Sequence, residues 1–372
     1  MKLSTYLFFP LFTSFLILIA VCLAACAPKF GKHPEGERLE RIQRSPNYHD
    51  GVFHNQIEAP QPIDKESRLK ILWEVFFQKK PRRIIPETPI PAVKTDLRAL
   101  DVARDTLVWL GHSSFYLTLG GKRILIDPHF SDHAAPFSGI NKAFAGTTIY
   151  SAEDMPEIDY LLLTHDHWDH LDFPTITALE PSVGSVVCGL GVGAHLEYWG
   201  YPKEKIHEGD WYDSLPLQED FTAHILPARH FSGRFLTRNK TLWVGFALIT
   251  PNRKIFISGD GGYGPHFAET GKSFDGFDLA ILENGQYDTR WPYTHMMPEE
   301  AALAAVELGA KVLVPAHSSK FSMARHPWDE PLKRLAEASR DKPYLFWTPI
   351  IGEPVFLDDE ERTYPAWWEG VE

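Results

Sequence analysis

The chain has 372 residues, of which 44% are hydrophobic and 23% charged, and this globular composition excludes a mainly disordered or collagen-like protein. The formal net charge of -12 disfavours general nucleic-acid binding, because an acidic surface repels the phosphate backbone. Three cysteines are too few for a disulfide scaffold. The N-terminal residues 27–100 carry 14 Lys and Arg against 10 Asp and Glu, so this basic segment is expected to differ in role from the acidic body.

The second residue, Lys2, is basic, and an apolar run follows over residues 7–25. This pattern indicates a secretory signal, although about 20 apolar residues would also suffice for an uncleaved membrane anchor. The run ends in Leu-Ala-Ala-Cys at Cys26, which resembles a bacterial lipobox. The resemblance implies removal of residues 1–25, lipidation of Cys26 and anchoring in the bacterial cell envelope. Ala27 after the cysteine favours the outer membrane, with the protein facing the periplasm.

Proline and charged residues punctuate the segment between the signal and the body. We expect a lipidated tether over residues 26–45 and an arm over residues 46–104 with one helix at 65–77. That helix carries aromatic residues at helical spacing and a basic end, which is typical of contact with a membrane surface. The alternative, which we favour, is a helix that packs on the body with its basic end in solvent.

From residue 105 onward, short apolar runs and turns predict a body of strands and helices that reaches residue 350, followed by a tail over 351–372. Strands are predicted at 106–110, 115–119, 123–127, 158–164, 183–188, 221–226, 242–250, 254–258, 279–283 and 311–315. Helices are predicted at 172–179, 298–308 and 331–338. Strands dominate first and helices follow, which favours a layered α/β protein.

A dense polar motif, His165-Asp166-His167-Trp168-Asp169-His170, follows the apolar strand at 158–164. Crowded imidazoles and carboxylates repel one another unless a cation relieves the repulsion, and zinc accepts both ligand types. His165 and His167 can hold one metal ion, whereas Asp169 and His170 can face a second. A hydrogen-bonded surface loop is the alternative, and this density of ligand types disfavours it.

The motif resembles the signature of the metallo-β-lactamase superfamily. Within that superfamily, residues 109–115, 124–131, 258–263 and 296–301 are most similar to the N-acylphosphatidylethanolamine-hydrolysing phospholipase D group. The resemblance covers residues 45–350 and implies an α/β fold, a four-layer αββα sandwich with an N-terminal arm. It also implies a ligand set of seven side chains, in which His165, His167 and His230 bind one zinc, Asp169, His170 and His317 bind another, and Asp260 bridges the two.

Other residues are expected to support this pair of metal ions, for which iron or manganese are alternatives to zinc. Asp169 and Asp260 are assigned catalytic as well as ligand roles, and the resemblance implies a substrate-facing His295. Asp127 ends a strand and can orient a ligand histidine, whereas His112 lies in the opening motif and can line the site.

The expected function follows from two metal ions that activate a water for attack on phosphorus or a carbonyl carbon. We expect a phospholipase D-type phosphodiesterase that acts on phospholipids at the membrane to which Cys26 anchors it. A lactonase or a soluble phosphodiester hydrolase of the same superfamily, acting on a small-molecule ester, is an alternative. A non-catalytic metal-binding envelope lipoprotein is another, although structural zinc usually closes a single tetrahedral site.

Overall fold

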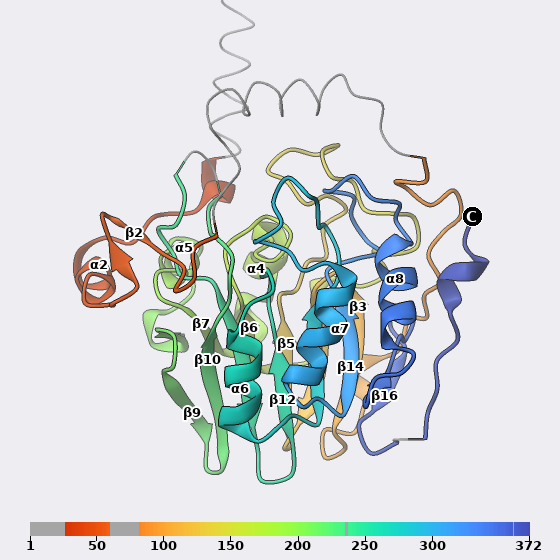
Figure 1. The fold of residues 1–372 in the computed structure, drawn as a ribbon. Coiled ribbons are helices and arrows are strands. Elements are labelled where there is room, and N and C mark those ends of the chain that lie inside the picture. The colour runs from red at the N-terminus through yellow and green to blue at the C-terminus, as the bar shows by residue number, and fades with distance from the viewer. Residues whose placement is uncertain (1–26, 60–81, 235–236, 360) are drawn as a thin grey trace, which may run out of the picture.

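The computed structural model describes residues 27–59, 82–234, 237–359 and 361–372, and two seven-stranded sheets form its centre. The sheets lie face to face, with helices on their outer sides (Figure 1). This arrangement is the four-layer αββα sandwich that the sequence predicts.

The first sheet has the strand order β16-β3-β4-β5-β6-β7-β8. The strands from β16 to β5 pair in antiparallel fashion, whereas β5 to β8 are parallel. Helices α4 (Phe173–Leu179) and α5 (Gly193–Tyr198) lie in the connections after β6 and β7. The strand bounds are β3 Thr106–Gly111, β4 Ser114–Leu119, β5 Lys122–Ile126, β6 Ile158–Leu163, β7 Val183–Gly189, β8 Ile206–Gly209 and β16 Pro354–Phe356.

The second sheet has the order β15-β14-β13-β12-β11-β10-β9, with its parallel strands from β12 to β15. Its strands are β9 Ser214–Gln218, β10 Phe221–Pro227, β11 Val244–Ile249, β12 Lys254–Ile257, β13 Leu279–Glu283, β14 Val312–Ala316 and β15 Leu345–Phe346. Helices α6 (His266–Phe274), α7 (Pro298–Glu307) and α8 (Glu330–Ser339) lie in its connections.

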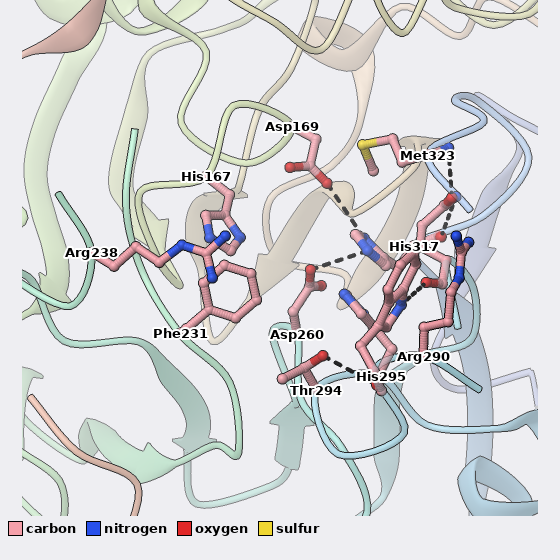
Figure 2. Close-up of a pocket in the computed structure, with 12 residues that line it drawn as sticks. His167, Asp169, Phe231, Arg238, Asp260, Arg290, Thr294, His295, His317 and Met323 are labelled. Carbon is pink, nitrogen blue, oxygen red and sulfur yellow. Dashed lines mark hydrogen bonds and ion pairs between the residues drawn. The ribbon is translucent and has the colours of Figure 1, made fainter. Parts of the chain in front are cut away.

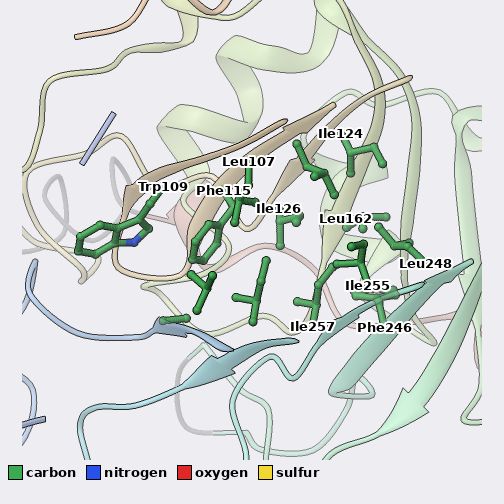
Figure 3. Packing of buried hydrophobic residues seen from close by; sticks show 14 of the residues in the cluster. Leu107, Trp109, Phe115, Ile124, Ile126, Leu162, Phe246, Leu248, Ile255 and Ile257 are labelled. Carbon is green, nitrogen blue, oxygen red and sulfur yellow. The ribbon is translucent and has the colours of Figure 1, made fainter. Parts of the chain in front are cut away.

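The apolar core lies between the two sheets, where side chains such as Ile126, Phe246 and Ile257 meet (Figure 3). All residues of strand β3 are buried, and its side chains contact two different layers. Leu107 points into this central core, whereas Val108 packs with the outer layer, because successive side chains of a strand face opposite sides. A strand that is buried on both faces is therefore mostly apolar, and Thr106 is the one polar residue of β3.

The N-terminal segment packs on the body instead of forming the free tether expected up to residue 45. It contains η1 (Ala27–Phe30), α2 (Gly36–Ile42), β1 (Tyr48–His49) and β2 (Val52–Phe53). Arg38 of α2 pairs with the buried carboxylate of Glu208 on β8 at 2.9 Å, which fixes the helix to the first sheet. The remaining short helices are η2 Leu97–Ala99, η3 Ala152–Asp154, η4 Glu180–Ser182, η5 Lys203–Lys205 and η6 Trp367–Gly370.

Other sequence predictions differ from the structure or lie outside the described residues. The predicted tail contains β16, which pairs with β3, so residues beyond 350 complete the first sheet. The predicted helix at 65–77, the signal segment and Cys26 all lie outside the described ranges. Within those ranges, we find no helix that is both long enough and apolar enough to cross a bilayer.

Candidate metal centre

The candidate ligands lie together because they follow strands that end at the same edge of the sandwich. Residues 165–170 follow β6 of the first sheet, whereas His230, Asp260 and His317 follow β10, β12 and β14 of the second. Strand β10 runs in the same direction as β12, since each pairs in antiparallel fashion with β11. The carboxyl ends of all four strands therefore meet, and the structure brings all seven predicted ligands into one buried site.

The first group of ligand atoms comes from His165, His167 and His230. The Nδ1 atom of His167 lies 2.9 Å from His165 Nε2 and 3.2 Å from His230 Nε2. Burial lowers the pKa of His167 to about 4, and burial together with the neighbouring imidazoles lowers those of His165 and His230 well below the usual value. All three rings are therefore neutral near pH 7, as metal ligation requires.

The second group comprises Asp169, His170 and His317, with Asp260 between it and the first. Asp260 Oδ2 lies 3.1 Å from both His170 Nε2 and His317 Nε2. The same oxygen lies 3.9 Å from His165 Nε2 and 3.8 Å from His230 Nε2, in the first group. One carboxylate thus faces ring nitrogens of both groups, which is the position expected of a bridging ligand.

Unpartnered polar atoms indicate that the centre suits cations. Among the described residues, Asp260 Oδ1 is buried without a hydrogen-bond partner, and His170 Nε2 and His317 Nε2 face only carboxylate oxygens. Buried polar atoms without partners cost free energy, whereas divalent cations take nitrogen and carboxylate ligands of this kind. Burial also raises the pKa of Asp260 to about 6, and a bound cation would favour its ionised form. The donor set therefore fits a pair of divalent metal ions.

A supporting network around Asp127 holds the histidines of the metal loop, which we define as residues 165–171. His170 Nδ1 donates to Asp127 Oδ2 at 2.8 Å, which leaves Nε2 facing Asp260. His165 Nδ1 contacts Thr164 Oγ1 at 3.0 Å, and that hydroxyl donates to the same Asp127 oxygen at 2.6 Å. Asp127 thus orients two candidate ligands, one directly and one through Thr164.

Further supports come from residues that lie far apart in the sequence. His230 Nδ1 donates to the Thr294 carbonyl at 2.9 Å, and His317 Nδ1 lies 3.1 Å from Ser113 Oγ. His112 Nε2 donates to Asp169 Oδ2 at 2.9 Å, so it contacts a ligand directly. Sequence reasoning selected His112 but missed Thr164, Ser113 and Thr294, although Ser113 lies within the opening motif at 109–115.

A pocket of about 320 Å³ opens beside the ligands (Figure 2). His295 lines it, stacks on His317 with ring centroids 5.2 Å apart, and donates from Nδ1 to the buried Glu283 at 2.8 Å. The sequence analysis did not identify Glu283, nor two arginines in the lining. The full lining is His167, Asp169, Phe231, Arg238, Asp260, Gln286, Arg290, Trp291, Thr294, His295, His317 and Met323.

Comparison with known proteins agrees with this fold. A model of the Beta-lactamase superfamily domain matches residues 122–318. An uncharacterized protein of Mycobacterium tuberculosis is 38% identical over 331 residues, which cover 88% of each chain. The N-acyl-phosphatidylethanolamine-hydrolyzing phospholipase D 1 of Caenorhabditis elegans is 31% identical over 269 residues, covering 66% of this chain and 74% of that protein.

Among solved structures, the metallo hydrolase Igni18 of Ignicoccus hospitalis shares the fold, with a TM-score of 0.53 and 19% identity over 68% of this chain and 97% of that one. The chain therefore belongs to the beta-lactamase superfamily. It is a metal-dependent hydrolase, as is a relative in Pyrobaculum aerophilum that is 27% identical over 241 residues, covering 64% of this chain and 94% of that protein. Its relatives include the phospholipase D group that the sequence motifs resemble.

Proposed function

We propose that the protein is a dinuclear metal-dependent phosphodiesterase that hydrolyses phospholipids of the N-acylphosphatidylethanolamine type. The position of Asp260 Oδ2, 3.1–3.9 Å from four ring nitrogens in two ligand groups, carries this proposal. One cation, with zinc as the first candidate, would lie among His165, His167 and His230, and the other among Asp169, His170 and His317. When bound, such a pair activates water and stabilises negative charge that develops on a phosphoryl or carbonyl group.

The lining of the pocket supports a phosphodiester with an apolar part. Arg238 and Arg290 line the pocket, and guanidinium groups recognise phosphate oxygens well. Arg290 also pairs with Asp288 at 2.6 Å, so Arg238 is the first candidate for the phosphate. Phe231, Trp291 and Met323 supply apolar surface in the same pocket. A volume of about 320 Å³ is at the small end of ligand pockets, so it suits a headgroup and the adjoining ester better than whole acyl chains. The name of the Caenorhabditis elegans relative gives the same substrate class.

We assign a substrate-contacting role to His295. Its Nδ1 is committed to Glu283, which leaves the other ring nitrogen available to the pocket. Burial lowers the pKa of His295, so the ring is neutral near pH 7, and its Nε2 can accept a hydrogen bond from a substrate O–H or N–H group. Glu283 is completely buried and also accepts a hydrogen bond from the Met296 backbone, which fixes the segment that carries His295.

Anchoring in the outer membrane through lipid on Cys26 is part of the proposal. It rests on the Leu-Ala-Ala-Cys sequence at residues 23–26 and on the preceding apolar run. An anchored enzyme would face phospholipid headgroups directly, which agrees with an interfacial substrate.

The test uses the zinc-loaded full-length protein in mixed micelles with a bacterial lipid extract and added N-acylphosphatidylethanolamine, in oxygen-18 water. We expect labelled phosphatidic acid by mass spectrometry, because hydrolysis places the water oxygen on phosphorus. Asp260→Ala should abolish the product, whereas the surface variant Asp159→Asn should retain it. Unlabelled products or no lipid turnover would refute the phospholipase, and turnover of lactones alone would favour the lactonase alternative.

A further inference from the structure

The first described residues of the chain lie against the outer side of the metal loop. We call residues 27–34 the strap. The Trp199 indole donates to the carbonyl of Pro28 at 2.7 Å, and the backbone N–H of Lys32 donates to His195 Nδ1 at 3.1 Å. The ring of Phe30 makes a T-shaped contact with Trp168, the aromatic residue inside the metal loop, with ring centroids 5.3 Å apart. The strap therefore touches the loop as well as the body.

Arg234 connects the strap to both ends of the metal loop. Its Nη1 atom donates to the carbonyl of Asp166 at 2.9 Å and to that of Leu171 at 2.7 Å. Its Nε and Nη2 atoms donate to the carbonyl of Lys29 at 3.1 and 2.8 Å. The guanidinium also lies 4.0 Å from the centroid of the Trp168 ring. Since Arg234 is only 3% exposed, its donors depend on these three carbonyls rather than on water.

A second path runs from the strap to the loop through His195. This ring accepts from Lys32 and donates from Nε2 to Asp166 Oδ2 at 3.2 Å. The Asp166 carboxylate also accepts from Thr241 Oγ1 at 2.8 Å and from the Gly233 backbone at 2.6 Å. Asp166 is buried next to two candidate ligands but belongs to neither ligand group, so its carboxylate serves to fix the loop.

We propose that the strap is part of the metal centre's scaffold, with Arg234 as the positioning residue that joins strap and metal loop and thereby sets metal affinity. Three candidate ligands, His167, Asp169 and His170, lie between the two loop carbonyls that Arg234 holds. Removing the strap contact would leave the Nε and Nη2 donors of the buried Arg234 unpaired. The loop would then relax, and the distances among its ligand atoms would change. This inference rests on the proposed metal centre, not on the proposed substrate.

One consequence concerns the N-terminal end. Lys29, whose carbonyl Arg234 binds, comes three residues after Cys26. The segment that leads to the proposed lipid anchor is therefore part of the active-site scaffold rather than a free linker.

Two glycines allow a matched test in the full-length protein. Gly31 lies in the strap at φ +71°, and a Cβ there would lie 2.1 Å from His195 Nδ1, so alanine would push the strap away from His195. Gly36 begins α2 at φ +54°, where a Cβ would meet nothing within 4 Å. Both alanine substitutions carry the strain of a positive φ, but only Gly31→Ala disturbs the strap contact.

The experiment measures zinc affinity by competition with a chromogenic chelator, together with kcat and KM. We expect Gly31→Ala and Arg234→Lys to bind zinc about 10–100-fold more weakly than wild type, the range found when residues that hold metal ligands in place are changed. The zinc affinity of Gly36→Ala should stay within about twofold of wild type. In Gly31→Ala and Arg234→Lys, partial metal loss should lower kcat and leave KM nearly unchanged. Circular dichroism checks that each variant is folded. If Arg234→Lys does not fold, the zinc affinity of Gly31→Ala alone tests the inference.

Wild-type zinc affinity in folded Gly31→Ala and Arg234→Lys would overturn the inference, as would equal losses in Gly31→Ala and Gly36→Ala. Failure of the wild type to bind zinc would instead refute the metal centre itself. Wild-type zinc binding without lipid turnover would refute the proposed substrate and leave the strap inference intact.

Discussion

Replacing Asp127 by asparagine should weaken metal binding while leaving the fold intact. Asp127 accepts three hydrogen bonds, at 2.8 Å from the Thr164 backbone, 2.6 Å from Thr164 Oγ1 and 2.8 Å from His170 Nδ1. An asparagine has the same shape, but one of its two positions is an NH2 group, which cannot accept. If that group faces the Thr164 N–H, a buried donor is left unpaired. If it faces His170, it favours the tautomer with the proton on Nε2, the atom that must ligate.

In the first arrangement the cost, about 1–3 kcal/mol for one unsatisfied buried group, falls on the folded protein with or without metal. In the second arrangement a cost of the same size falls on metal binding, because the proton must leave His170 Nε2. Because every 1.4 kcal/mol is tenfold, this corresponds to about 5- to 150-fold in metal affinity. The assay is zinc stoichiometry after dialysis against a graded series of chelator concentrations, with circular dichroism as a check of folding. Asp159→Asn is the control, since Asp159 accepts from a backbone N–H at 2.9 Å on the same sheet but far along the strands from the loop. Wild-type zinc retention in folded Asp127→Asn would refute the reasoning.

Three further predictions concern the substrate, the acid stability and the core. Arg238→Gln should lower kcat/KM for a phosphodiester by about 10- to 100-fold, the value of a charge-assisted hydrogen bond, with zinc content unchanged; an unaltered kcat/KM would remove Arg238 from recognition. Burial lowers the pKa of His266 to about 4, so the folded state binds fewer protons than the unfolded state between pH 6.5 and 4, and stability falls as the pH falls through that window. In urea titrations between pH 7.5 and 4.5, the free energy of unfolding of His266→Phe should therefore fall less than that of wild type, by at most about 3 kcal/mol. Equal falls in the two proteins would contradict the lowered pKa of His266. Phe246→Ala, in the core between the sheets, should cost about 3–5 kcal/mol in the same titrations, and a loss below 1 kcal/mol would show that the sheets repack there.

The sequence predicted most of the central strands, including the apolar strand before the metal loop, and it predicted the loop that carries four of the seven candidate ligands. Both signals are local, since β6 is an apolar run interrupted only by Asp159 and the metal loop concentrates its polar residues within six positions. It missed β9, because Ser214–Gln218 is a half-exposed edge strand that contains a proline and exists through its pairing with β10. Helices α5 and α6 were also missed, since each is short and carries glycine.

The candidate ligands His230, Asp260 and His317 were found through family resemblance, because each is a single residue after a strand. Their supporting contacts have no local signal. Ser113 meets His317 across 204 positions of the sequence, and Thr294 meets His230 across 64. Such pairs exist only because the carboxyl ends of strands from both sheets meet at one edge. The helix at 65–77 and the lipidation of Cys26 stay predictions.

The most direct test of the central claim, a two-metal centre bridged by Asp260, is anomalous X-ray diffraction from crystals of the zinc-loaded protein at the zinc absorption edge. The account predicts two anomalous peaks per chain. One should lie among His165, His167 and His230 and the other among Asp169, His170 and His317, with Asp260 contacting both. A single peak, or zinc bound only at the exposed cluster of His49, Asp50 and His54, would contradict it.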